Sequence, residues 1–189
     1  SVILTLHRHG DGIPQSWKDE IIGDIPITSD DLDKIDGTIL MKSDGSASYN
    51  FASIYDDISF GVNYIIRGSD HITNTAKQIV LHHLISGGQP LPKFSHVGLI
   101  HFAGKKLSKR DGAASMLYYR DRGYEPEAIL NFMARLGWGP KVDDKSTALL
   151  PKEKMLELFL EGGTMRSSSA NMDLAKLDSF NRKYKARNV

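Results

Sequence analysis

The sequence predicts an α/β fold, with a parallel sheet followed by an α-helical region. The first observation is a strand-like apolar run at 62–68, which is followed by a helical stretch with one apolar face and then by a second apolar run at 94–100. Strand, helix and strand at this spacing are typical of a parallel sheet, which binds ligands at the carboxyl ends of its strands. The second observation is that only helix-like segments follow residue 112.

Composition sets limits on the class of protein. The 189 residues are 40% hydrophobic and 25% charged, with a net charge of +1 and no cysteine. The near-zero charge gives no global attraction to nucleic acid or membranes, so any RNA contact must come from local patches. Without cysteine there are no disulfides or thiolate metal sites, which fits a reducing cytosol. No apolar run approaches the roughly 18 residues of a membrane span, so we expect a cytoplasmic protein without a membrane partner.

The first 35 residues contain two predicted strands. Alternation over 1–6 predicts the first, and 21–27 predicts the second, with Pro26 indicating a sheet edge. His7 and His9 could begin a metal site, but no third ligand is nearby, and a solvated loop is favoured.

Acidic residues dominate 28–33, and they could chelate a hard cation. The pattern favours a solvated, turn-rich loop instead, because a charge run usually covers a solvated surface.

The middle of the chain carries the predicted sheet. A short strand is expected at 38–41, and the strand at 62–68 has a cation, Arg67, at its C-terminal end. Ser69-Asp70 offers a cap to the next helix, which Gly87-Gly88 ends. The last strand is expected at 94–100.

Helices are predicted for the remainder at 113–122, 126–136, 152–160 and 173–184. We therefore divide the chain into segments 1–35, 36–111 and 112–189.

A basic loop follows the last strand. Gly104-Lys105-Lys106-Leu107-Ser108-Lys109-Arg110-Asp111-Gly112 places four cations and a hydroxyl between glycines. Lysine and arginine suit phosphate oxygens, and such a loop can stabilise charge that develops as phosphate leaves. A solvated basic turn is the alternative.

Several polar residues can converge at one edge of the sheet with this loop: Tyr49, Arg67, Asp70, His71 and Lys109. An arginine at a strand end can clamp a carboxylate with two hydrogen bonds, and a tyrosine hydroxyl can bind an amino acid's polar groups. Four of them also have a structural alternative: Tyr49 as a core aromatic, Arg67 in a salt bridge, Asp70 as a helix cap and His71 as a packing residue.

The ordered motifs resemble the glutamyl-tRNA synthetase family of class I aminoacyl-tRNA synthetases. Lys106-Leu107-Ser108-Lys109-Arg110 resembles the KMSKS signature. Upstream, the family blocks K-S-D-G-x-P-T-Y-x-F-A, D-D and I-R-G-E-D-H-x-x-N-T are similar to Lys42–Ala52, Asp56-Asp57 and Ile66–Thr75. Downstream, 120–138 is similar to the family's helical segment. The resemblance covers nearly the whole chain.

The resemblance implies an ATP-dependent ligase that activates L-glutamate as glutamyl-adenylate and transfers it to the 3' end of tRNA(Glu). Segment 1–35 would end the acceptor-stem insertion, 36–111 would be the second half of the Rossmann catalytic domain, and 112–189 would contact the tRNA stem. ATP with Mg²⁺ would be a substrate, with no protein-bound metal. The parent enzyme would be monomeric.

The resemblance also assigns roles to single residues. The glutamate site would contain Tyr49, Arg67, Ser53 and His71. The ATP site would contain Asp70, Ile100, Lys106, Ser108, Lys109 and Arg110. Lys109 and Lys106 would act in catalysis.

Three departures from the family pattern affect these expectations. Ala47-Ser48 replaces Pro-Thr, and Ser69 replaces a glutamate. No HIGH motif is present, because His7-Arg8-His9-Gly10 is not a convincing substitute. We expect that motif upstream of the chain and the anticodon-binding domain downstream, so the isolated segment should be inactive.

Two other interpretations stay open. One is a non-catalytic module that binds tRNA or protein, suggested by cations around Tyr184 in 182–187. The other is the paralogue that glutamylates queuosine in tRNA(Asp), against which the intact 106–110 motif argues.

Overall fold

The structure is a computed structural model that describes residues 1–6, 12–108, 115–138, 149–161 and 165–187. The chain packs as two compact units, Ser1–His96 and Val97–Val189. The segment 97–111, which the sequence analysis joined to the α/β part, begins the second unit. The assignment of the three predicted segments to parts of a synthetase stays a prediction.

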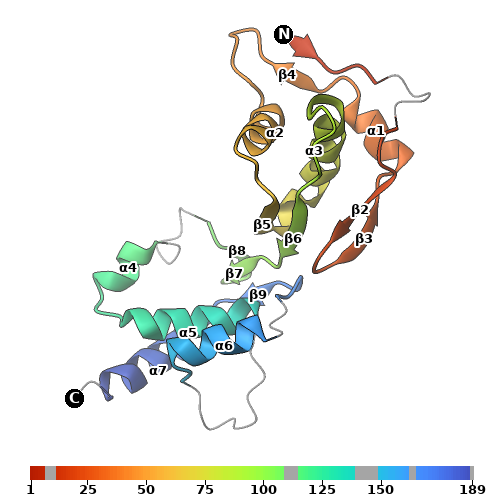
Figure 1. The fold of residues 1–189 in the computed structure, drawn as a ribbon. Helices are drawn as coiled ribbons and strands as arrows, with labels where there is room; N and C mark the ends of the chain where they lie inside the picture. Colours follow the sequence, from red (N-terminus) through yellow and green to blue (C-terminus); the bar gives the residue numbers. More distant parts are fainter. Residues whose placement is uncertain (7–11, 109–114, 139–148, 162–164, 188–189) are drawn as a thin grey trace. The chain divides into compact units, whose positions relative to one another are not determined.

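The first unit is the mixed α/β part of the chain (Figure 1). Its elements in order are β1 (Val2–Ile3), β2 (Ser16–Asp19), β3 (Gly23–Pro26), α1 (Ser29–Ile35), β4 (Ile39–Met41), α2 (Tyr49–Ser59), β5 (Tyr64–Gly68), the 3₁₀ turn η1 (Ser69–His71), α3 (Ile72–Ile85) and β6 (Lys93–Val97).

The main sheet of this unit has the strand order β3-β2-β6-β5, and β1 pairs separately with β4. Strands β2 and β3 form an antiparallel hairpin, whereas β2 pairs in parallel with β6 through Asp19 and Phe94. Helix α3 lies alongside β5 and β6 (Figure 1). The α/β class with parallel strand pairing is therefore confirmed, and Pro26 lies on an edge strand as expected.

A compact apolar core fixes α3 against this sheet. Trp17 and Phe94 meet edge to face with their ring centroids 5.4 Å apart. Ile27, Ala76 and Ile79 complete the buried cluster. The core thereby joins β2, β6 and α3, which are the elements that carry the buried polar residues described below.

The prediction of a loop at 28–33 is wrong, because these residues begin α1. Thr28 and Asp31 form a capping box in which each side chain bonds the other residue's backbone N–H. Such a box satisfies amide groups that a helix start leaves without partners. The acidic residues here therefore serve the helix.

Two other predictions for this unit are corrected. Helix α3 begins at Ile72 behind the η1 turn, and no side chain caps it, so Ser69-Asp70 is not its cap. The apolar run expected to form one strand at 94–100 ends as β6 at Val97.

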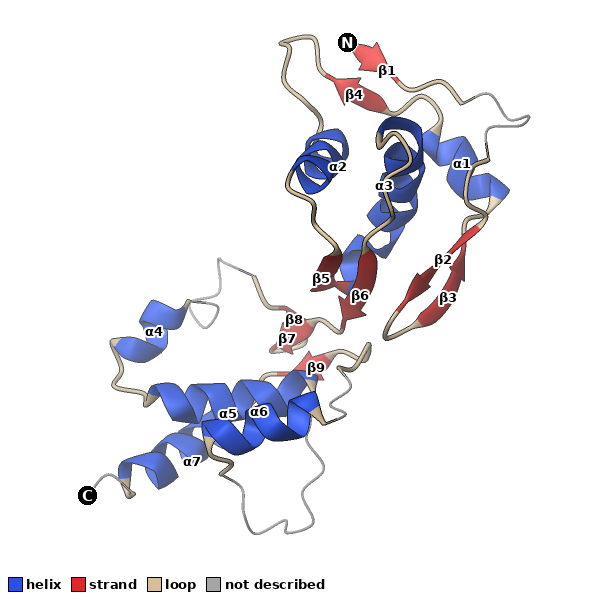
Figure 2. Ribbon diagram, viewed as in Figure 1, coloured by secondary structure: helices blue, strands red, loops and turns tan. Residues whose placement is uncertain are grey.

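The second unit contains β7 (Ile100–Phe102), β8 (Lys105–Lys106), α4 (Met116–Arg120), α5 (Pro126–Gly137), α6 (Lys152–Leu160), β9 (Ala170–Asn171) and α7 (Leu174–Lys185). Figure 2 shows its helices beside short strands in the order β8-β7-β9. Strand β7 runs antiparallel to β8 and parallel to β9.

The break between β6 and β7 follows from a close backbone approach at Gly98. A Cβ atom there would lie 2.0 Å from the carbonyl oxygen of Ser168, so only glycine fits without a shift. The Gly98 N–H also donates to the Arg166 carbonyl at 2.9 Å. Contacts with a distant segment therefore end one strand and position the next.

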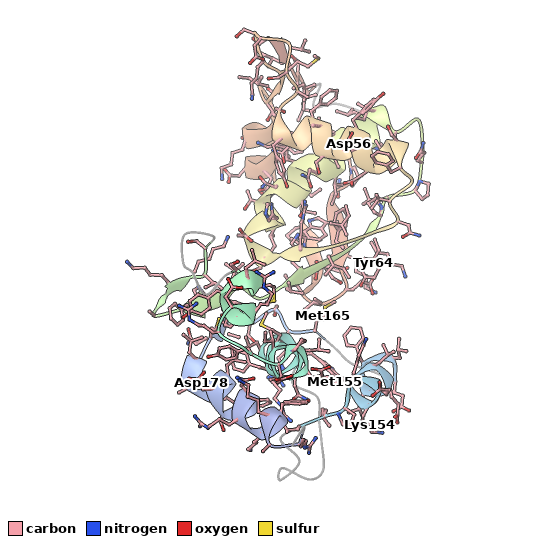
Figure 3. All side chains as sticks on the ribbon, turned by 90° about the vertical axis from the view of Figure 1, so that its left-hand side faces the viewer. Asp56, Tyr64, Lys154, Met155, Met165 and Asp178 are labelled. Atoms are coloured by element: carbon pink, nitrogen blue, oxygen red, sulfur yellow. The ribbon has the colours of Figure 1, made fainter. Side chains whose placement is uncertain are left out.

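Helix α5 organises the second unit by packing against α6, α7 and β9. Phe132 and Leu177 are fully buried in its core. Tyr124 donates a hydrogen bond to Asp178 of α7, which Figure 3 labels. In the part of the chain that the structure describes, none of the helices is long and apolar enough to cross a bilayer.

Candidate functional site

Arg67 lies near the end of β5, half-buried, and three neutral side chains hold its guanidinium. Its Nε donates to His96 Nε2 at 3.3 Å. Its Nη2 donates to Thr75 Oγ1 at 2.7 Å and to Gln78 Oε1 at 2.6 Å. Gln78 is itself fixed by its bond to Asn50 Oδ1 at 3.1 Å. Residues of β5, α3, β6 and α2 thus set the orientation of one cation.

The bonds leave the charge of Arg67 without a partner of opposite sign in contact. No carboxylate among the described residues lies within 4.0 Å of its guanidinium. Burial lowers the pKa of Arg67, while Tyr49 and Asp57 act in the opposite direction. A guanidinium has five N–H donors. The three bonds above use Nε–H and the two hydrogens of Nη2, so the Nη1 hydrogens are the donors that these bonds leave.

Helix α2 brings predicted glutamate-site residues toward Arg67. Tyr49, Ser53 and Asp57 are spaced four residues apart on one face of the helix. Tyr49 is 59% exposed and begins the helix, so it is not the core aromatic of the alternative interpretation. Burial raises the pKa of Asp57, while the nearby Arg67 charge opposes this rise. Tyr49 and Arg67 are therefore neighbours, as the sequence analysis expected.

His71 joins the same group of residues from the η1 turn. Its ring centroid lies 6.2 Å from that of Tyr49, and its Nδ1 lies 3.3 Å from Asn74 Nδ2. Asp70 precedes it and is exposed. The structure thus brings Tyr49, Arg67 and His71 together, and Ser53 lies on the same face of α2 as Tyr49. Their contacts with glutamate or ATP stay predictions.

A buried pair beside Arg67 was not predicted from the sequence. The side chains of His96 and Asp19 are both fully buried, and Nδ1 of His96 lies 2.7 Å from Oδ2 of Asp19. Burial lowers the pKa of His96, and Asp19 only partly offsets this. Burial alone would raise the pKa of Asp19, but hydrogen bonds from His96, Ile22 and Ile21 outweigh it and lower that pKa.

The pair could have been suspected from one signal only, which is a run of polar residues in a strand expected to be buried. Ser95 and His96 are fully buried. The Ser95 hydroxyl bonds the Tyr64 hydroxyl at 2.8 Å. Asp19 is 77 residues away in sequence from His96, so no local pattern links them.

The described part of the basic loop begins as a hairpin in the second unit. Strands β7 and β8 are joined by Ala103 and Gly104, which both have positive φ. A two-residue turn of this kind matches the twist of antiparallel strands. Lys106 and Ser108 are exposed, and both have interactions within the protein.

Leu107 explains the apolar position of the basic motif. It packs against the core cluster around Phe132, and its N–H donates to the Ile100 carbonyl at 2.8 Å. The motif is thereby anchored just before Lys109 and Arg110, which lie outside the described residues. The contact of Ile100 with adenine and the convergence of Lys109 with Arg67 stay predictions.

Two further expectations concern metals and RNA. Among the described residues, no group of three potential His, Asp or Glu ligands gathers to hold a metal; His7 and His9 lie outside those residues.

In the 182–187 segment, Tyr184 uses its hydroxyl within the unit, where it lies 3.0 Å from Asn131 Nδ2 and 3.3 Å from the Leu150 carbonyl. It is therefore a packing residue, and the cations beside it form the exposed face of α7.

Comparisons with known proteins bear on the whole chain. Residues 8–185 match the model of the family described as tRNA synthetases class I (E and Q), catalytic domain. Glutamate--tRNA ligase 2 of Campylobacter fetus subsp. fetus is 40% identical over 169 residues, which are 89% of this chain and 35% of that protein. Glutamate--tRNA ligase 1 of Sulfurimonas denitrificans is 40% identical over 168 residues, 88% of this chain and 34% of that protein.

Solved structures give the same assignment. The glutamate-tRNA synthetase of Elizabethkingia anophelis matches with a TM-score of 0.70 at 28% identity, covering 89% of this chain and 36% of that one. A glutamate tRNA ligase of Elizabethkingia meningosepticum, in complex with its amino acid, matches with a TM-score of 0.71 at 28% identity, covering 91% and 37%. The chain spans about a third of the length of the relatives it matches. It belongs to the class I tRNA synthetase family (E and Q) and is part of its catalytic domain.

Proposed function

We propose that this chain is part of a glutamyl-tRNA synthetase, which activates L-glutamate with ATP and transfers it to the 3' end of tRNA(Glu). The observation that carries the proposal is Arg67, a half-buried guanidinium held by neutral side chains with no described carboxylate in contact. Such a group is suited to the side-chain carboxylate of glutamate, because the Nη1 hydrogens that these bonds leave can donate charge-assisted hydrogen bonds to it. The named relatives are all glutamate--tRNA ligases, which agrees with this substrate.

Residues around Arg67 would complete the amino-acid site. The Tyr49 hydroxyl and the Ser53 hydroxyl would hydrogen-bond the substrate's polar groups, and His71 would lie against them. In this arrangement the protein binds and orients the amino acid before the reaction, which lowers the barrier by fixing the reacting groups.

The basic motif would serve the ATP half of the reaction. Lys106, Ser108, Lys109 and Arg110 would contact the phosphates, with Asp70 and the Ile100 backbone completing the nucleotide site. Mg²⁺ would enter with ATP. As the α-carboxylate of glutamate attacks the α-phosphorus of ATP, the bond to the leaving pyrophosphate breaks. Lysine and arginine charges would then stabilise the negative charge that moves onto it.

The test uses the complete gene product that carries these residues, since the chain covers about a third of its relatives. We expect glutamate-dependent exchange of pyrophosphate into ATP. Arg67→Gln should raise the KM for glutamate by about 100-fold or more, because it removes one partner of a partly buried charge pair. Lys93→Gln, at an exposed position in the same unit, is the matched control.

Two results would contradict the proposal. One is exchange with another amino acid and not with glutamate, and the other is an unchanged glutamate KM in Arg67→Gln. The 189-residue chain by itself should show no exchange, and strong exchange would show that the residues named here suffice. Salt-dependent binding of tRNA by the chain, with no activity in the gene product, would favour the RNA-binding module.

A further inference from the structure

We propose that His96 is a positioning residue for Arg67: its unprotonated Nε2, fixed by the bond from Nδ1–H to Asp19, holds the edge of the guanidinium that faces away from the substrate. The inference rests on the proposed function, in which Arg67 binds the glutamate carboxylate. It adds two buried residues that act through Arg67 without touching the substrate themselves.

The first step is the tautomer of His96. Its Nδ1 lies 2.7 Å from an oxygen of Asp19, and an ionised carboxylate can only accept hydrogen bonds. Nδ1 must therefore carry the proton. In the neutral ring Nε2 is then an acceptor, which is what the Nε–H of Arg67 requires at 3.3 Å.

The second step is that Asp19 is held firmly enough to fix this tautomer. Its Oδ1 accepts from the amides of Ile21 and Ile22, both at 2.9 Å. Its Oδ2 accepts from the His96 amide at 3.0 Å as well as from the ring. Four donors surround one buried carboxylate, so neither the carboxylate nor the ring it bonds is free to turn.

The third step concerns which hydrogens of Arg67 remain for a ligand. His96 takes Nε–H, while Thr75 and Gln78 take those of Nη2. Thr75 Oγ1 also lies 2.9 Å from His96 Nε2, and its hydroxyl can donate to that nitrogen or to the His71 carbonyl, which is 2.9 Å away as well. His96, Thr75 and Gln78 therefore line one connected edge of the guanidinium. The donors of Nη1 then point away from that edge. A protonated Nε2 would instead oppose a donor to the Nε–H of Arg67 and place a second positive charge beside it.

A purely structural role is the competing explanation, because the Asp19–His96 pair also joins β2 to β6. Two substitutions separate the explanations. In His96→Gln the amide oxygen can occupy the position of Nε2 and accept from Arg67, but the donor to Asp19 is lost. In His96→Asn the amide can replace Nδ1–H and donate to Asp19, but nothing accepts from Arg67.

We expect the two variants to differ in glutamate binding. In the complete gene product, His96→Asn should raise the KM for glutamate by about tenfold, because a small displacement of a positioning group has effects of this order or larger. The KM for ATP should stay within about twofold of the wild type, as a group that acts through Arg67 alone requires. His96→Gln should retain most of the glutamate affinity. Equal effects of both variants, or no effect of His96→Asn, would overturn the inference.

Failure of the inference is distinguishable from failure of the proposed function. If Arg67→Gln leaves the glutamate KM unchanged, the proposed function fails. If Arg67→Gln raises it and His96→Asn does not, only the positioning role fails.

A second measurement needs no catalytic activity. Nitrogen NMR of the complete gene product should show His96 with a protonated Nδ1 and an unprotonated Nε2, and Asp19→Asn should shift the proton toward Nε2. A wild-type ring protonated at Nε2 would overturn the inference, even in a protein without measurable exchange.

Discussion

The two units differ in what they bury. Among the described residues of the first unit, the interior contains polar side chains that bond one another and Arg67, including Asp19, Thr75, Gln78 and His96. In the second unit the buried positions are mainly aromatic and aliphatic, and Asn131 is the buried polar residue among those described. Buried polar networks fix orientation, whereas apolar packing gives stability without direction. The first unit therefore holds the fixed polar groups that the proposed function uses for glutamate, and the second supports the basic motif.

The largest effect should come from the apolar interior. Phe132→Ala should lower the free energy of unfolding of the second unit by about 3–5 kcal/mol, because it removes a buried ring and leaves a cavity. Phe132 packs edge to face with Phe180, with centroids 6.2 Å apart. Hydrogen exchange of peptides from each unit measures the loss. Leu130→Ala, at an exposed position on the same helix, is the matched control, and an equal loss in both variants would contradict the comparison.

The two units should also respond to opposite extremes of pH. Burial lowers the pKa values of His96 and His82 below the ordinary 6.5, so the unfolded chain binds more protons than the folded one as pH falls below about 6.5. The first unit should therefore lose stability from that pH downward. In the second unit, the bond to Asp178 raises the pKa of Tyr124 from 10.0 to about 12, so stability should fall as pH rises through that range.

Hydrogen exchange near pH 7, 5.5 and 11, corrected for intrinsic rates, measures both trends. Tyr124→Phe should remove most of the alkaline loss, since no phenol remains to ionise at that position. If both units lost stability together in acid, this would contradict the prediction that the first unit is the acid-sensitive one. We expect each loss to be smaller than that of Phe132→Ala.

The smallest effect should come from a helix cap. Thr28→Ala should destabilise the first unit by about 1 kcal/mol, because it leaves an amide at the start of α1 without its partner. Ser29→Ala, one residue later and outside the capping box, is the control. Urea unfolding of both variants measures the difference. An unchanged midpoint in Thr28→Ala would show that water satisfies this helix start equally well.

Local patterns predicted the elements that short-range physics determines. Helix α6 has the predicted bounds Lys152–Leu160, and α5 differs by one residue, because a repeating apolar face is visible within the helix itself. The α1 helix was missed because the acidic residues were interpreted as a solvated run, although Thr28 and Asp31 have capping-box spacing.

Long-range contacts explain what the sequence could not reveal. Recognition of the family placed Tyr49 and Arg67 in one site, and they are neighbours. The His96–Asp19 pair was missed, because it depends on the parallel pairing of β2 with β6. The end of β6 was misplaced because Ser168, far along the chain, decides it.

The parallel pairing of β7 with β9, next to the contact between Gly98 and Ser168, affects the chain during biosynthesis. Strand β7 takes β9 (Ala170–Asn171) as its parallel neighbour, so the hairpin that leads to Leu107 is completed by residues translated much later. During synthesis on the ribosome, the hairpin that leads to the basic motif lacks its pairing with β9 until that distal strand has emerged. A nascent chain released by a premature stop before residue 170 would carry every residue of the motif and still lack the strand that holds its base.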